Sequence, residues 1–192
     1  MDFWKVIQSR KSIRSFSNKT IPADILTKIL EAGRLAPSCQ NRQCWHYVIV
    51  KKDKLRRSLA LKSGLISKIN FFIKEAPIII VACANPKQSC VLNKQDYYLV
   101  DTAISFQQMM LTAWNYGIGS CWLAAFNEEK VKKILNIPSK IRIVGLSPFG
   151  YPKEKKSLYA KTVGTFAGSN KRKKVTKIIS YNSWNNNNPE ET

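Results

Sequence analysis

Arg10, Ser12 and Arg14 form the first group of residues whose types and spacing could do chemistry. In an extended backbone, residues two positions apart project from the same side, roughly 7 Å from one another. Two guanidinium groups and a hydroxyl arranged in this way would suit the oxygens of a phosphate group. The alternative is a basic loop that faces solvent, and these three residues alone do not decide between the two interpretations.

The polar segment 37–41 is a second candidate, because Ser38 and Asn41 offer a hydroxyl and a carboxamide. Both groups can form hydrogen bonds with the edge of a heterocyclic ring. The same residue types also close helix-ending turns through bonds to the nearby backbone. Taken alone, these residues favour the turn over the ligand site.

A third candidate lies around Gly117 and Gly119, which come just before Cys121 and Trp122. Glycine lets a backbone approach a flat ligand closely. The chain has neither a Gly-x-Gly-x-x-Gly sequence nor a Walker A sequence, so it lacks both of these nucleotide-binding fingerprints. Trp45 and Trp122 are expected to pack in the core rather than to serve as ligand platforms.

The remaining reactive side chains indicate no separate catalytic or metal site. His46 is the only histidine and opens a predicted strand, where a packed or edge position is expected. Asp101 is expected near the start of a long helix, where a carboxylate favours the helix dipole. No two cysteines have a C-x2-C spacing, and in a cytoplasmic protein we expect all five to be thiols: Cys39, Cys44, Cys83, Cys90 and Cys121.

Apolar periodicity and turn residues predict the elements that must position these side chains. Helices are expected at 2–9, from Pro22 to Gly33, within 51–74, at 96–116 and between Asn127 and Pro138. Strands are expected at 47–50, 77–84, 119–123 and 141–146. The 96–116 helix is apolar enough to be largely buried. Together these elements predict one α+β domain over residues 1–184, followed by a disordered tail at 185–192.

The composition is strongly basic, with 32 Lys and Arg against 12 Asp and Glu and a formal net charge of +20. A field this positive would attract polyanions such as nucleic acid, although an AT-rich genome would also enrich Lys and Asn. Hydrophobic residues make up 44% of the chain, which is enough for a core and excludes general disorder. The longest apolar run, 76–84, is far shorter than the roughly 20 residues of a bilayer span. The N-terminus lacks the apolar stretch of a signal peptide, so we expect a cytoplasmic protein.

Five segments in order give the sequence a resemblance to the nitroreductase family of flavin-dependent oxidoreductases. They are SRKSIRSF (9–16), APSCQNRQCWHYVIV (36–50), DTAISFQQMMLTAWNYGIGSCWLAAF (101–126), GLSPFGYPKEK (145–155) and RKKVTKIISYNSW (172–184). The resemblance covers residues 3–184. It implies an α+β fold with a central, mostly antiparallel sheet flanked by helices, and an intertwined homodimer with FMN at the subunit interface.

The resemblance also implies which residues contact FMN. Those that would hold the phosphate and ribityl chain, with a backbone contact near the ring, are Arg10, Ser12, Arg14 and Lys11. Those that would reach the flavin from the partner subunit are Pro37, Ser38, Cys39 and Asn41. Those that would line the other side of the ring are Cys121, Trp122 and Leu123, and those that would close around the ring or phosphate are Gly150, Lys153 and Arg172.

This sequence departs from the family pattern at several positions. The family often has Ser at Cys39 and Pro at Cys44, and its C-terminal signature usually has Pro at Lys174. Gln108 stands where an Asn is frequent. These departures affect the expectation of which residues contact the pyrimidine ring of FMN and which groups Arg172 contacts.

The implied activity is hydride transfer from NAD(P)H through flavin N5 to a nitro-aromatic, quinone or similar small-molecule acceptor. Because the cofactor carries this chemistry, no acid–base pair is required, and we predict no catalytic side chain. The alternatives are another flavin reaction on the same fold, namely reductive dehalogenation, ene reduction or flavin breakdown. A basic nucleic-acid-binding protein is the rival from another class, but no nucleic-acid-binding module is recognisable in the sequence.

Overall fold

The fold is described from a computed structural model for residues 1–64, 70–154 and 172–184. The predicted disordered tail at 185–192 lies outside these residues. The α-helices are α1 (Phe3–Ser9), α2 (Ala23–Arg34), α3 (Asp53–Lys62), α4 (Tyr97–Asn115) and α5 (Glu128–Leu135). The strands are β1 (Trp45–Val50), β2 (Ile78–Ala84), β3 (Val91–Leu92), β4 (Gln95–Asp96), β5 (Gly119–Ser120) and β6 (Arg142–Gly150). Short 3₁₀ turns are η1 (Cys39–Asn41), η2 (Phe71–Glu75), η3 (Pro86–Gln88) and η4 (Val175–Lys177).

The central sheet has the strand order β1-β2-β6-β5, and each neighbouring pair is antiparallel, as predicted. Strand β2 is buried along its whole length because both faces of the sheet are covered. Its alternate side chains enter different cores: Ile79 and Val81 face one, and Ile78 and Ile80 face the other. Strand β1 forms an edge, and His46 is exposed there.

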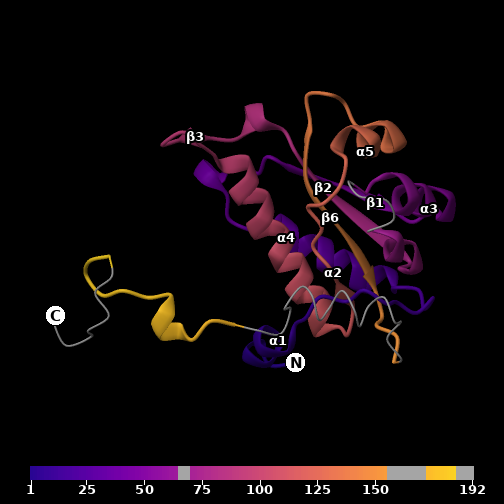
Figure 1. Cartoon of the computed structure of the whole chain (residues 1–192), viewed down its shortest axis with the longest axis horizontal. Helices are drawn as coiled ribbons and strands as arrows, with labels where there is room; N and C mark the ends of the chain where they lie inside the picture. The colour runs from indigo at the N-terminus through magenta and orange to yellow at the C-terminus, as the bar shows by residue number, and fades with distance from the viewer. Residues whose placement is uncertain (65–69, 155–171, 185–192) are drawn as a thin grey trace.

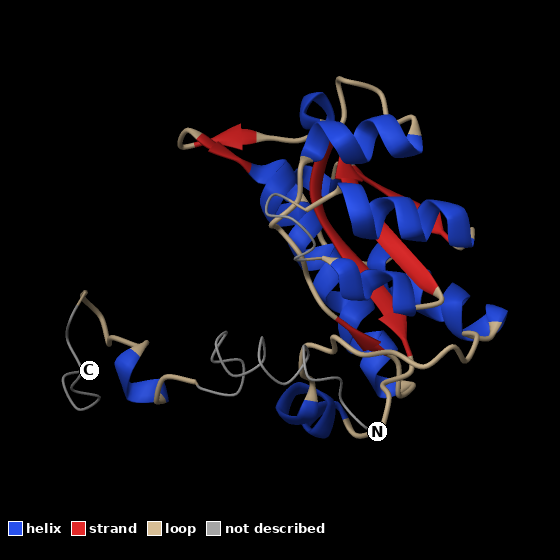
Figure 2. Cartoon of the chain, turned by 45° about the vertical axis from the view of Figure 1, so that its right-hand side comes forward, coloured by secondary structure: helices blue, strands red, loops and turns tan. Residues whose placement is uncertain are grey.

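Helices cover both faces of this sheet (Figures 1 and 2). Helices α2 and α4 contribute Ile29, Phe106 and Met109 to one core. Helices α3 and α5 contribute Leu59 and Val131 to the other. The resulting helix–sheet–helix layering is the predicted α+β arrangement, and α4 spans the length of one layer.

Helix α4 is less buried than its composition predicts. Leu99, Val100 and Ile104 on its first half are 46%, 44% and 39% exposed. The short helix α1 shows the same behaviour, since Val6 is buried whereas Phe3 and Trp4 are 70% and 63% exposed. Composition reports how apolar a helix is, but only the arrangement of its neighbours decides which apolar residues they cover.

Two strand boundaries differ from the prediction. Strand β6 continues through Pro148 to Gly150 instead of ending at residue 146. It remains paired because Phe149 lies opposite Ile78 of β2 and Ser120 of β5. Strand β5 contains only Gly119 and Ser120, so the predicted strand 119–123 is shortened.

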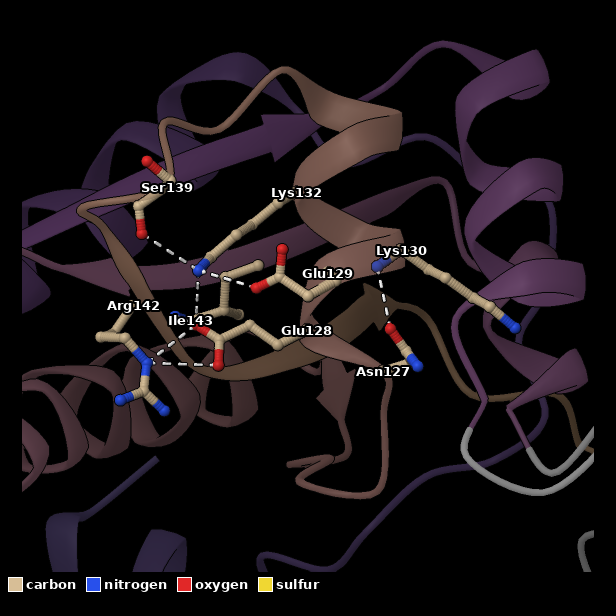
Figure 3. Close-up of polar contacts among 8 residues, drawn as sticks. All are labelled: Asn127, Glu128, Glu129, Lys130, Lys132, Ser139, Arg142 and Ile143. Carbon is tan, nitrogen blue, oxygen red and sulfur yellow. Dashed lines mark hydrogen bonds and ion pairs between the residues drawn. The ribbon is translucent and has the colours of Figure 1, made fainter.

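Helix α5 begins as its sequence predicts, with the Asn127 side chain accepting a hydrogen bond from the Lys130 N–H at 2.9 Å. An ion-pair network then joins the helix to β6 (Figure 3). Glu128 accepts from the Ile143 N–H at 2.9 Å and lies 3.3 Å from the Lys132 ammonium and 3.0 Å from Arg142 Nε. Burial alone would raise the pKa of Glu128, but its bonds to Arg142, Ile143 and Lys132 together lower it.

Residues 172–184 lie apart from the layered body in both overall views (Figures 1 and 2). All of them are exposed except Tyr181, which is half-buried. Their apolar members include Val175, Ile178 and Trp184, which are 62%, 65% and 90% exposed. Among the described residues, no helix is both long and apolar enough to cross a membrane.

Candidate functional site

Arg10, Ser12 and Arg14 are here called the basic cluster. The segment that carries them lies along the edge of the central sheet formed by β5. Ser12 forms a parallel β-bridge with Ser120, and the Ile13 N–H donates to the Ser120 carbonyl at 2.9 Å. Ile13 is buried, the three members of the basic cluster are half-buried, and Lys11 is exposed. The backbone is therefore extended where the spacing argument required it to be.

The buried Cys121 thiol lies within the electrostatic influence of the basic cluster. Burial raises the pKa of the Cys121 thiol, while the charges of Arg14 and Arg10 and a hydrogen bond with Ser12 act in the opposite direction. The charges of both arginines therefore act on the Cys121 thiol. Because burial prevails, Cys121 is a neutral thiol at neutral pH and a poor nucleophile.

The end of β6 is fastened to the segment that holds the basic cluster. The Lys153 N–H donates to the Ser15 carbonyl at 3.2 Å, while the Lys153 ammonium pairs with Glu75 at 3.2 Å. Gly150 is buried, and a Cβ atom there would lie 2.7 Å from Cδ of Pro77. Packing inside the chain therefore requires the glycine at position 150.

Trp122 and Leu123 follow the buried Cys121 and are half-buried. The Trp122 ring packs edge-on against Phe106, with ring centroids 5.2 Å apart, and lies over Gly145. The Leu123 N–H donates to the Leu146 carbonyl at 2.9 Å, which ties this segment to β6. The structure thus gives Trp122 the core position that the residue-based argument favoured.

The loop of residues 37–44 lies after α2 and holds the second set of predicted contacts. The Ser38 hydroxyl accepts from the Gln43 N–H at 2.9 Å, and Asn41 Oδ1 accepts from the Gln43 side chain at 3.0 Å. The loop therefore closes as a turn through its own polar groups. Gln40, Asn41 and Gln43 have φ angles of 51°, 55° and 47°, a backbone conformation that residues other than Gly rarely adopt. Such strain persists only where surrounding contacts enforce it.

Asp101 supplies one of these contacts, and its role differs from the predicted interaction with the helix dipole. It is 2% exposed, and its Oδ1 accepts from the Cys39 N–H at 2.9 Å. Its Oδ2 accepts from the Ser89 hydroxyl at 3.2 Å and lies 3.8 Å from the Cys44 thiol. Asp101 is the only Asp, Glu, Lys or Arg in α4, and this isolation was the sequence signal for a buried, structural carboxylate.

Cys39 and Cys90 form a disulfide, so the prediction of five thiols is wrong for this pair. The two residues are 51 positions apart in the sequence, but their Cα atoms are only 6.3 Å apart, within the range that a disulfide can bridge. Sequence spacing could not reveal this contact, because the fold brings the 37–44 loop to the residues that precede β3. Cys44, Cys83 and Cys121 are free thiols, as predicted.

The two sets of predicted FMN contacts lie at opposite ends of α4. The 37–44 loop is held by Asp101 near the start of the helix, beside β3, whereas Ser120 and the basic cluster follow its end, beside α1 (Figure 1). The helical rise places Asp101 about 21 Å from Asn115 along the axis. Pro37, Ser38, Cys39 and Asn41 therefore do not meet the basic cluster within one chain. Arg172 is exposed, at the start of the segment 172–184.

The geometry supports anion binding at one end of α4 and a preformed polar loop at the other. Two arginines, a hydroxyl and an extended backbone can bind a phosphate without any acid–base group. The basic cluster therefore fits a phosphorylated cofactor, whereas the 37–44 loop can offer the remaining donors of Ser38 and Asn41 to the edge of a ring.

Comparison with known proteins places this fold among its relatives. The model of the nitroreductase family matches residues 7–70 and 66–151. A protein from Archaeoglobus fulgidus, provisionally named an NADH dehydrogenase/NAD(P)H nitroreductase, is 34% identical over 159 residues, covering 81% of this chain and 88% of that protein. An iodotyrosine deiodinase from Thermotoga neapolitana is 26% identical over 178 residues, covering 81% of this chain and 91% of that enzyme.

A solved structure has the same fold. The crystal structure of a nitroreductase family protein from Clostridium novyi NT matches with a TM-score of 0.76 and 39% identity, covering 82% of this chain and 89% of that one. The sequence match and the shared layering agree with the resemblance found in the five segments. The chain therefore belongs to the nitroreductase family.

Proposed function

We propose that the protein is an FMN-dependent oxidoreductase that transfers hydride from NAD(P)H to a nitro-aromatic, quinone or similar acceptor. The observation that supports this most strongly is that Arg10, Ser12 and Arg14 are half-buried and alternate along a segment that is bridged to β5 at Ser120. This arrangement offers forked and hydroxyl donors to the phosphate of FMN. When bound, FMN supplies the hydride chemistry, and the residues of the chain bind it, orient it and exclude water.

The proposal includes a homodimer whose two subunits share each FMN site. The supporting observation is that the basic cluster and the 37–44 loop lie at opposite ends of α4 in one chain. A second copy could bring its loop to the basic cluster of the first. The exposed apolar residues of α1 and α4 offer a surface for this contact, and burying them would stabilise the dimer. In this proposal residues 1–184 form one domain, and the 172–184 segment, with Arg172, reaches the partner.

Purification followed by absorption spectroscopy tests the activity. The protein should be yellow, or become yellow after reconstitution with FMN, and NAD(P)H should bleach the flavin absorbance under anaerobic conditions. Adding a nitro-aromatic or a quinone should then restore the colour. A folded protein that neither retains nor takes up FMN would contradict the proposal.

A complementation experiment tests the shared site. Arg14→Ala should weaken the basic cluster, and Asn41→Ala should weaken the 37–44 loop, so each variant alone should bind FMN poorly. In a heterodimer of the two variants, one site carries both substitutions and the other carries neither. Random mixing should therefore restore strong FMN binding at about one quarter of all sites, as expected for a two-fold dimer. If mixing restores nothing, although mass spectrometry shows heterodimers, the shared site is refuted.

Reductive dehalogenation is the second candidate, because the chain is similar to the deiodinase from Thermotoga neapolitana along most of its length. Steady-state assays with a nitro-aromatic, a quinone and a halogenated phenol separate the two activities. Preference for the halogenated phenol would favour this candidate over the first. For either activity, we propose the cytoplasmic location that the sequence predicts.

A further inference from the structure

The Cys39–Cys90 disulfide has no part in the proposed hydride transfer, yet it joins two segments near the predicted ring-contacting residues. Cys39 begins η1 within the 37–44 loop, and Cys90 directly precedes the β3–β4 hairpin. Cys39 is half-buried, whereas Cys90 is 5% exposed. Within a single chain, Cys39 is therefore the more accessible member of the pair.

The 37–44 loop needs such support because its backbone is strained. Three of its residues, Gln40, Asn41 and Gln43, have positive φ angles. Each residue in this region costs of the order of 1 kcal/mol, so the loop keeps its shape only while neighbouring groups enforce it. The disulfide is the one covalent tie between the described residues of the loop and the rest of the chain outside its own backbone.

Noncovalent ties connect the same two segments. Arg42 Nη1 donates to the Ser89 carbonyl at 3.2 Å, and the Asn85 N–H donates to the Cys44 carbonyl at 3.0 Å. Asp101 accepts from both the Cys39 N–H and the Ser89 hydroxyl. These ties would keep the two sulfurs close after reduction, so the disulfide could form again.

We propose that Cys39 and Cys90 form a redox-reversible latch that holds the 37–44 loop in the shape required for flavin contact. The ligand class of this new site is a thiol reductant, such as a small dithiol or a dithiol protein. The proposal rests on the FMN function for its consequence, but the latch itself is a property of the chain alone.

The exchange reaction balances with a dithiol as the reductant. One thiolate of the dithiol attacks Cys39 Sγ, the Cys39–Cys90 bond breaks, and Cys90 leaves as a thiolate that takes up a proton. The second thiol of the reductant loses its proton and attacks the mixed disulfide, releasing Cys39, which is protonated to the thiol. The protein gains two electrons and two protons, and the reductant becomes a disulfide. A disulfide oxidant such as oxidised glutathione reverses the process.

Cys44 lies beside this pair but should not compete for it. Burial raises the pKa of the Cys44 thiol, and the nearby Asp101 carboxylate raises it further, although bonds with Ser89 and Thr102 oppose this. The attacking species in exchange is a thiolate. Cys44 therefore stays protonated at neutral pH, and exchange remains confined to Cys39 and Cys90.

Hydrogen exchange and FMN titration of the full-length protein in its oxidised and reduced states test the latch. After treatment with oxidised glutathione, peptide mapping should show Cys39 linked to Cys90, and dithiothreitol should remove the link. Reduction should accelerate amide exchange in residues 37–44 about tenfold by favouring local opening. It should also weaken FMN binding about tenfold, because a smaller fraction of the loops would be competent to bind.

Cys90→Ser and Cys39→Ser should each behave like the reduced wild-type protein under both conditions. Cys83→Ala is the matched control, because this thiol lies in the sheet away from the loop, and its redox response should equal that of the wild type. Equal loop exchange in the two redox states, or no Cys39–Cys90 peptide after oxidation, would overturn the latch. A redox-dependent loop with unchanged FMN affinity would overturn the link to flavin binding. A protein that binds no FMN in either state would refute the proposed function, while its loop exchange would still decide the latch.

Discussion

The two ends of helix α4 are built in different ways. At its C-terminal end, the basic cluster lies on an extended segment that the Ser12–Ser120 bridge and other main-chain bonds join to the sheet. At its N-terminal end, the 37–44 loop has one main-chain bond to the other described residues, from the Asn85 N–H to the Cys44 carbonyl, and is otherwise held through side chains, above all the Asp101 carboxylate and the Cys39–Cys90 disulfide. Main-chain bridging tolerates many side chains, whereas a loop built around one carboxylate does not. The loop end should therefore be the more fragile of the two.

The two ends also offer complementary chemistry. The basic cluster is cationic and suits a phosphate, whereas the loop presents a hydroxyl and a carboxamide beside a strained backbone. A ligand with both a phosphate and a polar ring would need both sets. Because α4 separates them, a second copy of the chain offers the most direct way to bring them together.

The largest effect should come from Asp101→Asn, which removes the charge at the loop end and keeps the shape of the side chain. A buried amide would present its NH2 group to a neighbouring donor, so the free energy of unfolding should fall by about 3 kcal/mol. Urea denaturation monitored by tryptophan fluorescence measures this loss. Asp24→Asn, in the exposed first turn of α2, is the control and should change stability little. Similar losses in both variants would show that the loop end has no special dependence on its carboxylate.

The next effect concerns the basic end. Arg14→Ala should weaken FMN binding about 50-fold, a little over 2 kcal/mol, because a charged, forked donor to the phosphate is lost. Stability should change little, since the segment is joined to the sheet through its main chain. Fluorescence titration of FMN provides the measurement. Arg57→Ala on α3 is the charge-matched control, with an exposed side chain paired to Asp53. An equal loss of affinity in the control would point to general electrostatics instead of a phosphate site.

A third prediction concerns the middle of α4, between the two ends. The Tyr47 hydroxyl contacts Ser105 Oγ, which donates to the Gly33 carbonyl at 2.6 Å, and burial raises the pKa of Tyr47 to about 12. The folded state holds the Tyr47 proton more tightly than the unfolded state does. The contribution of Tyr47 to the free energy of unfolding is therefore complete below pH 10 and is lost as the pH rises from 10 to 12. The stability difference between wild type and Tyr47→Phe should therefore shrink by about 2 kcal/mol over that interval. A constant difference in denaturant melts would show that Tyr47 does not titrate there.

The smallest effect should come from Glu128, whose ion-paired carboxylate contrasts with the buried Asp101 carboxylate. Bonds from Arg142, Ile143 and Lys132 outweigh burial and lower the pKa of Glu128, so its stabilisation is present above the ordinary carboxyl pKa and is lost in acid. Glu128→Gln should cost about 1 kcal/mol at neutral pH, because solvent screens this partly exposed network. The difference from wild type should narrow below pH 4.5. Thermal melts across this range test the prediction, and a loss as large as that of Asp101→Asn would remove the distinction between the two carboxylates.

Local sequence patterns predicted most of the fold. The continuous apolar run gave the position of β2, and Asn127 with its following acids gave the start of α5, because caps and apolar runs act over a few residues. The same patterns overestimated the burial of α4 and ended β6 too early. Both errors concern neighbours that come from distant parts of the chain.

The sequence by itself determined the family, the layered α+β class and the spacing of Arg10, Ser12 and Arg14, because these follow from ordered motifs and backbone periodicity. Only the tertiary structure decided that Asp101 accepts from Cys39 across 62 positions and that Cys39 meets Cys90 across 51. It also placed the two sets of predicted contacts at opposite ends of α4. Contacts at such separations leave no periodic trace in the sequence, since they depend on how whole elements pack.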